Sequence, residues 1–325
     1  MILYLVVPIS FVITYLFLKW AIPRLKAEGM VGRDVNKPDQ PEVAEMGGLG
    51  VLLGITLTLS ILAAIYSVFN GFDIRIIVLI YSVLLVGLVG IIDDLLDIPK
   101  WVKFVLPIIG AIPLITYSSL IDTNITIPMI GTIDLGFLYV FFLLPIMYTG
   151  AVNLTNILAG FNGLEYSLAV VNSIFLILVG FMYGKDLITI SGLVLLGAST
   201  AFLIFNRYPS KVFPGDTGTL IIGGLIVTAL ILDNFESLAI PIFMLYGLDG
   251  IIKILNGLPS KGWWGKYVDG KLYSPDRPVS LPQMIMKLAG GITEQNLVFV
   301  IVFAQIIITS VWLVVLAYLK MISGI

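Results

Sequence analysis

Carboxylate side chains gather where one long apolar segment of the sequence ends. Asp93 and Asp94 directly follow the run LLVGLVGII, and Asp97 comes about one helical turn after Asp93. Carboxylates this close repel one another unless a cation or a proton lies between them. Oxygen ligands suit Mg²⁺, which takes one or two carboxylates together with substrate phosphates. A magnesium site for phosphate chemistry is one interpretation, and carboxylates solvated at a helix end are the other.

A second acidic residue, Asp216, lies in the segment VFPGDTG, directly before another apolar run. The flanking glycines allow a ligand to approach the backbone closely, and the free N–H groups of a helix N-terminus attract phosphate. The same residues are also typical of a simple helix N-cap.

Asparagines mark a third segment, NLTNILAGFNGLE, in which Asn153, Asn156 and Asn162 interrupt apolar residues. Unsatisfied amides facing lipid would cost several kcal/mol, so these side chains must meet one another, water or a ligand. An amide offers both a donor and an acceptor, which suits a nucleobase edge or an oxygen ligand of a metal.

The composition defines the setting of these residues. Of 325 residues, 59% are hydrophobic and 12% are charged, and the mean hydropathy is +1.07. This excludes a soluble domain, a disordered chain and a nucleic-acid-binding protein, which needs a basic surface. The chain has no Cys and no His, so proton and metal chemistry must depend on Asp, Glu, Asn, Lys and Arg.

Runs without Asp, Glu, Lys or Arg mark the segments long enough to cross a membrane. The run 135–164 is too long for one span, so we expect a span to about Val152 and then a re-entrant or loop-like segment. Asp249 and Lys253 are spaced as an i,i+4 pair within one span. We predict an all-α polytopic membrane protein, with residues 1–325 forming one integral membrane domain. The roughly ten expected transmembrane helices are 1–18, 46–72, 76–92, 104–121, 135–152, 166–184, 187–206, 217–232, 237–256 and 295–319.

The basic residues predict the orientation, because Lys and Arg favour cytoplasmic loops. All but three of the 18, namely Arg75, Lys185 and Lys320, fall on one face of this ten-span arrangement. We therefore expect a cell-membrane protein with both termini outside and with the polar segments forming a cytoplasmic active site. On the outer face, Asp122–Asp134 alternates Ile with Thr, which predicts a small β-hairpin.

Together these segments resemble the polyprenyl-phosphate N-acetylhexosamine-1-phosphate transferases. The resemblance extends from PEVAEMGG to SPDRP in the family's order, and NILAGFNGLE and NRYPSKVFPGDTG are similar to the branch that uses UDP-GlcNAc and dolichyl phosphate. It implies transfer of N-acetylglucosamine-1-phosphate from UDP-GlcNAc to a polyprenyl (dolichyl) phosphate, the first membrane step of glycan assembly, with N-glycan assembly as the expected pathway.

The resemblance also implies residue roles. Asp93, Asp94 and Lys103 match the paired acids and the phosphate-binding Lys of the catalytic site. Asp216 and Asn156 match ligands of Mg²⁺, for which Mn²⁺ is a candidate substitute. The implied substrate-binding residues are Lys37, Glu45, Asn162, Lys211 and Arg277, with Asn162 at the uracil.

The last cytoplasmic loop departs from the family, because the chain has no His and SPDRP offers a single Arg. This leaves the diphosphate contacts, the N-acetylhexosamine and the polyprenol length open. Direct displacement and a covalent intermediate are both compatible with the sequence, as is a homodimer. The alternatives to an enzyme are a polytopic transporter or lipid flippase without covalent chemistry, and a non-catalytic relative.

Overall fold

A computed structural model describes residues 3–69, 71–96, 98–127, 131–259 and 262–323. Nine helices among these residues are long and apolar enough to cross a membrane, so the chain is a multi-pass membrane protein. They are α1 (Leu3–Ala27), α2 (Gly48–Phe69), α3 (Ile74–Leu96), the run Gly136–Ile157 that ends in α7 (Leu144–Ile157), α8 (Leu164–Tyr183), α9 (Asp186–Asn206), α10 (Gly215–Leu232), α11 (Ala239–Leu255) and α13 (Glu294–Ser323).

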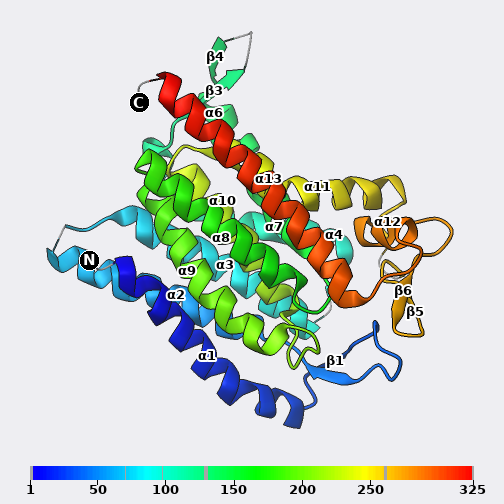
Figure 1. Ribbon diagram of the computed structural model, residues 1–325. Helices are drawn as coiled ribbons and strands as arrows, with labels where there is room; N and C mark the ends of the chain where they lie inside the picture. The colour runs from blue at the N-terminus through cyan, green and yellow to red at the C-terminus, as the bar shows by residue number, and fades with distance from the viewer. Residues whose placement is uncertain (1–2, 70, 97, 128–130, 260–261, 324–325) are drawn as a thin grey trace.

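The transmembrane segment expected over 104–121 is not one continuous helix. The chain there forms a broken series: α4 (Lys100–Val105), the 3₁₀ turn η1 (Leu106–Ala111), α5 (Ile112–Thr116) and the short turn η2 (Ser118–Leu120). Pro107 and Pro113 lack the N–H that a continuous helix needs. The series still leads from the end of the bundle near α4 to the opposite end, where β3 lies (Figure 1). Helix α1 begins and α13 ends at that same opposite end, as an even number of traverses requires.

A second expectation needs correction at the end of α7. The segment after Val152 is not loop-like, because the helix continues to Ile157. Helix α7 begins after α6 (Gly136–Leu138) and a π-helical turn, η3 (Tyr139–Leu143). The loop that follows is therefore short and runs only over residues 158–163.

Among the described residues, three antiparallel hairpins extend from the two ends of the bundle. The predicted outer hairpin is confirmed, with β3 (Asn124–Ile127) pairing β4 (Gly131–Asp134); Pro128 lies outside the described residues. At the other end β1 (Val31–Arg33) pairs β2 (Glu42–Ala44), and β5 (Lys266–Val268) pairs β6 (Lys271–Tyr273). The short helix α12 (Leu281–Leu288) follows β6.

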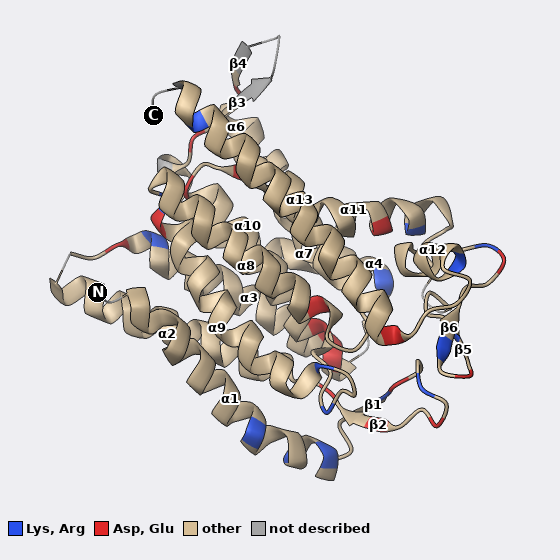
Figure 2. Ribbon diagram, viewed as in Figure 1, with Lys and Arg blue, Asp and Glu red and all other residues tan. Residues whose placement is uncertain are grey.

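The central helix is α10, which packs against α2, α3, α7 and α9. Of its residues Gly215–Leu232, 89% are buried inside the protein. A Cβ on Gly90 of α3 would lie 2.4 Å from the Cα of Thr217 in α10. Only glycine permits this approach of two backbones. Figure 2 shows the charged residues concentrated toward the two ends of the bundle, with the end that carries β1, β2, β5 and β6 the more heavily charged.

Candidate functional site

The ammonium of Lys103 lies between two carboxylates that are far apart in the sequence. Its Nζ is 2.7 Å from Asp93 Oδ1 and 3.4 Å from Asp216 Oδ2. Burial opposes the charge on Lys103, but the hydrogen bond to Asp93 and the charge of Asp216 raise its pKa above the usual range. The Asp93 side chain is nearly inaccessible, whereas those of Asp216 and Lys103 are 25% and 30% exposed. A ligand can therefore reach the group from the side of Asp216 and Lys103.

Asp94 has a different surrounding from its neighbour Asp93. Its Oδ1 accepts the backbone N–H of Asp216 at 2.6 Å. Its Oδ2 accepts the N–H of Thr217 at 3.1 Å and the hydroxyl of Thr217 at 2.7 Å. Asp94 of α3 thus caps the N-terminus of α10, whose first N–H groups have no partner within the helix. The N-cap interpretation of Asp216 is wrong, because Asp216 lies inside the first turn and its side chain does not cap it.

The turn before α10 is shaped for this contact. Gly215 has a φ of +67°, which most residues avoid. A Cβ there would also lie 2.6 Å from Asp94 Oδ2. Glycine at this position therefore brings the Asp94 carboxylate onto the helix terminus.

Glu45 joins the same site through backbone pairing. The Phe213 N–H donates to the Ala44 carbonyl at 2.7 Å, and the Gly47 N–H donates to the Phe213 carbonyl at 2.9 Å. The strand-like pairing brings Glu45 beside the start of α10. Burial, followed by the charges of Asp94 and Asp216, raises the pKa of Glu45 above its usual range.

Asn153 and Asn156 lie on the last turns of α7, with different surroundings. The Asn153 amide donates to the Phe104 carbonyl at 3.0 Å, so it fixes α7 against the helix that carries Lys103. Asn156 is half-buried, and its side chain makes no hydrogen bond within the described residues. Asn153 thus fixes α7 against α4, whereas a ligand role for Asn156 stays a prediction.

A second buried polar cluster lies around the predicted uracil residue, Asn162. Its side-chain amide donates to Asp34 Oδ2 at 3.0 Å, and its Oδ1 accepts the Ser210 N–H at 2.7 Å. Its backbone N–H donates to Glu294 Oε1 at 2.7 Å. One amide N–H and one oxygen lone pair of Asn162 are left over. The structure is therefore compatible with the predicted uracil contact without testing it.

Lys37 belongs to this second cluster rather than to the first. Its ammonium is 3.1 Å from Asp34 Oδ2, pairs with Glu294, and lies 4.4 Å from the centre of the Tyr208 ring. Asp34 and Glu294 were missed in the sequence. An acid in the first turn of a helix is common, so the pattern around Glu294 gave no signal of a contact with two distant loops.

The two remaining predicted substrate-binding residues are not brought into either cluster. Lys211 and Arg277 have exposed side chains on loops, and no ion pair of theirs occurs among the described residues. Asp97 lies outside the described residues.

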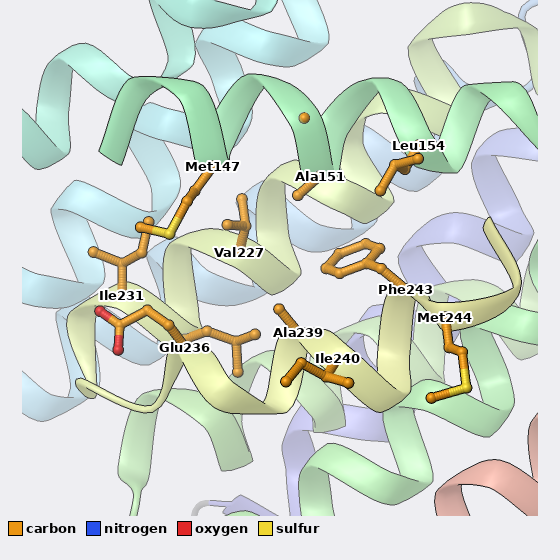
Figure 3. A pocket seen from close by; sticks show the side chains of 12 residues that line it. Met147, Ala151, Leu154, Val227, Ile231, Glu236, Ala239, Ile240, Phe243 and Met244 are labelled. Atoms are coloured by element: carbon orange, nitrogen blue, oxygen red, sulfur yellow. The ribbon is translucent and has the colours of Figure 1, made fainter. Parts of the chain in front are cut away.

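An apolar pocket of about 380 Å³ lies between α7, α10 and α11. Figure 3 shows Met147, Ala151 and Leu154 of α7 facing Phe243 and other side chains of α11 across it. Leu154 lines the pocket two residues before Asn156, in the last turn of α7. The pocket therefore reaches the last turn of α7, which carries Asn156 on another side of the helix.

The oxygen atoms of the first cluster, formed by Asp93, Lys103 and Asp216, suit a magnesium ion. Asp216 and Asp93 supply oxygen atoms, and the ammonium of Lys103 already occupies a cationic position between the two carboxylates. No group of three or more acidic side chains that could hold a metal occurs among the described residues. Mg²⁺ in phosphate-transfer sites needs only one or two carboxylates, since substrate phosphates complete its shell.

Comparison with known proteins gives a consistent picture. The model of the family "Glycosyl transferase family 4" matches residues 76–234, which include Asp93, Lys103, Asn156 and Asp216. A protein of Saccharolobus solfataricus, provisionally named UDP-N-acetylglucosamine–dolichyl-phosphate N-acetylglucosaminephosphotransferase, is 33% identical over 90% of both chains. A Sulfolobus acidocaldarius protein with the same provisional name is 30% identical over 90% of both chains.

More distant similarity extends to bacteria. A phospho-N-acetylmuramoyl-pentapeptide-transferase of Clostridium botulinum is 33% identical over 58% of this chain and 59% of its own length.

Proposed function

Because the chain belongs to glycosyl transferase family 4, we propose that it transfers N-acetylglucosamine-1-phosphate from UDP-GlcNAc to a dolichyl or related polyprenyl phosphate. Enzymes of this family transfer a sugar 1-phosphate to a polyprenyl phosphate. The relatives similar over 90% of the chain support the choice of UDP-GlcNAc and dolichyl phosphate. The products are polyprenyl-diphospho-GlcNAc and UMP, and the reaction is the first membrane step of glycan assembly.

The observation that carries this proposal is the position of Lys103 between Asp93 and Asp216, in a chain that also has an apolar pocket between α7, α10 and α11. Both substrates are anionic phosphates, and one of them has a long apolar tail. A cation-holding group of oxygen ligands and an apolar pocket in the same helix bundle suit this pair of substrates. A transporter would instead need its polar residues near the middle of the membrane.

The proposed roles follow from the positions of the side chains. Mg²⁺, when bound by Asp216 and Asn156, would neutralise charge on the diphosphate of the donor. Lys103 would hold a substrate phosphate while it keeps Asp93 as its partner. Asp93 orients Lys103, and Asp94 holds the first turn of α10 so that Asp216 faces the site.

The chemical step is an in-line displacement at the β-phosphorus of UDP-GlcNAc. A phosphate oxygen of the acceptor lipid forms the new P–O bond, and the bond from the β-phosphorus to the bridging oxygen breaks, so that UMP leaves with that oxygen. Such a phosphate monoester has a second pKa of about 6 and is largely dianionic at neutral pH. The attacking oxygen therefore needs positioning more than deprotonation.

The acceptor tail is proposed to occupy the apolar pocket between α7 and α11 (Figure 3). Its phosphate would then lie near Asn156 and Lys103. The excess of Lys and Arg at this end of the bundle supports a cytoplasmic site, with both chain termini outside.

One assay tests the proposal. Purified protein in lipid nanodiscs is supplied with UDP-GlcNAc, a polyprenyl phosphate and Mg²⁺, and UMP release is measured. We expect UMP only when all three are present, and a preference for UDP-GlcNAc over other UDP-sugars. Absence of UMP release from a protein that still binds UDP-GlcNAc would contradict the proposal.

A further inference from the structure

Helix α11 carries one buried ion pair in an otherwise apolar sequence. Asp249 Oδ2 and Lys253 Nζ are 2.8 Å apart, one helical turn from each other, as their spacing predicted. The exposed fraction is 0% for Asp249 and 8% for Lys253. Replacing a buried ion pair by apolar residues is often neutral for stability, so stability alone is a weak explanation for this pair.

Each charge of the pair also meets the end of another helix. The Lys253 ammonium donates to the carbonyl of Ile157, the last residue of α7. Asp249 Oδ1 accepts the N–H of Leu281, the first residue of α12, at 2.6 Å. A helix C-terminus carries partial negative charge and an N-terminus partial positive charge. The pair is therefore matched in sign to both termini, and it connects α7 to α12 through α11.

The Ile157 contact lies next to the proposed metal ligand Asn156 and at the start of the loop 158–163. The same ammonium lies 5.5 Å from the ring centre of Trp263. Trp263 packs on the far part of that loop, where a Cβ on Gly160 would lie 1.9 Å from the indole. Lys253 is thus in contact, directly or through Trp263, with both parts of the loop between Asn156 and Asn162.

Helix α11 also forms one wall of the apolar pocket, about one to two turns before Asp249. Phe243 and Met244 line the pocket from α11, and Leu154 lines it from α7. Close to the pair, a Cβ on Gly250 would lie 3.3 Å from Leu154 Cδ2. One helix therefore touches both the pocket and the loop of the donor site.

We propose that Lys253, held by Asp249, is a positioning residue that couples filling of the apolar pocket to binding of the nucleotide sugar. An apolar tail in the pocket orders α11 against α7, and the Lys253–Ile157 contact transmits that order to Asn156 and the loop 158–163. The inference rests on the proposed function, because it takes a polyprenyl chain as the occupant of the pocket. The two ligands then favour each other's binding reciprocally.

The test measures UDP-GlcNAc affinity by calorimetry, in nanodiscs with Mg²⁺, in the presence and absence of geranylgeraniol. This neutral polyprenol fills the pocket but has no phosphate, so no transfer takes place. In the parent protein we expect geranylgeraniol to tighten UDP-GlcNAc binding by about fivefold or more, the usual lower range of such coupling. In Lys253→Met we expect the effect of geranylgeraniol to fall to less than twofold.

Two further variants keep the test decisive. The double variant Asp249→Asn/Lys253→Met removes both charges, leaves no unpaired buried charge, and keeps an acceptor for Leu281, so it folds even if the single variant does not. It should also lose the coupling. Lys320→Met is the matched control, because Lys320 likewise donates to a carbonyl near the end of a helix, that of Met182 in α8, at the opposite end of the bundle. It should keep the parental coupling.

The outcomes separate the two proposals. If the parent does not bind UDP-GlcNAc at all, the proposed function fails. If the parent binds it without any effect of geranylgeraniol, or if the double variant keeps the full effect, the coupling role of Lys253 is refuted while the proposed function stands.

Discussion

The carboxylate of Asp94 accepts the backbone N–H of Asp216 at 2.6 Å, so one acid of the site fixes the backbone of another. The neighbouring residues Asp93 and Asp94 therefore have different roles. Asp93 contacts the Lys103 ammonium, and Asp94 holds the first turn of α10.

This division predicts different results for two substitutions at Asp94. Asp94→Ala removes three hydrogen bonds from the start of α10 and should lower the stability by roughly 1–3 kcal/mol, the cost of unsatisfied buried donors. Asp94→Asn keeps an acceptor oxygen and should lose about half as much. Thermal unfolding in detergent, followed beside UMP release, checks this. An Asp94→Ala variant with parental stability and no activity would instead indicate a direct catalytic role.

Asp216→Ala should abolish turnover while the protein remains folded, because its carboxylate is proposed to bind the metal and is partly exposed. The measurement is UMP release over a range of Mg²⁺ concentrations, with thermal unfolding as the control for folding. Activity within tenfold of the parent would exclude Asp216 as a metal ligand.

The raised pKa of Glu45 predicts that the stability of the folded protein depends on pH. Its pKa is raised in the folded protein by burial and by Asp94 and Asp216. An unfolded Glu ionises near pH 4.3, so the carboxylate costs stability increasingly above that pH and fully above the raised folded pKa. Glu45→Gln should therefore raise the unfolding midpoint at pH 7.5 in Mg²⁺-free buffer and leave it unchanged near pH 4. The exposed Glu42→Gln is the control, and an equal rise in both variants would refute the explanation.

Asn162 is expected to read uracil with the donor and acceptor capacity that Asp34 and Ser210 leave over. Asn162→Ala should weaken UDP-GlcNAc binding by roughly 1–3 kcal/mol at constant Mg²⁺, and CDP-sugars should be rejected by the parent. Asp34→Asn changes a direct partner of Asn162 without removing the Asn162 amide, so it should keep the preference for UDP over CDP. Equal affinity of Asn162→Ala and parent would leave Asn162 a structural residue.

The orientation of the chain is open to a direct test, because the parent has no Cys. Single cysteines in place of Lys211 and Asn124 should be labelled by an impermeant thiol reagent from opposite faces of sealed vesicles. Labelling of both from one face would mean that one of the three helices between them, α7, α8 or α9, does not traverse the membrane.

Local patterns predicted much of this molecule. Apolar run lengths located the nine long helices, alternation located the β3–β4 hairpin, and i,i+4 spacing located the Asp249–Lys253 pair. Lys103 lies between Asp93 and Asp216, and their roles in a catalytic site stay a prediction.

Contacts between distant segments were not predictable in this way. Nothing near Asp94 in the sequence indicates that it caps α10, and nothing near Glu294 indicates that it binds both Lys37 and Asn162. The break in α4–α5 was missed because an apolar run free of charges does not reveal how two prolines divide it.

The contact between Gly90 and Thr217 makes the site unusually intolerant of a substitution at Gly90. Side chains that meet in a core can change rotamer to admit an extra methyl group, but here backbone faces backbone and no rotamer can give way. Even Gly90→Ala would push α3 and α10 apart and carry Asp93 and Asp94 away from Asp216. Gly90, about one helical turn before Asp93, has only a hydrogen atom in place of a side chain. That hydrogen atom therefore sets how closely Asp93 and Asp94 approach Asp216.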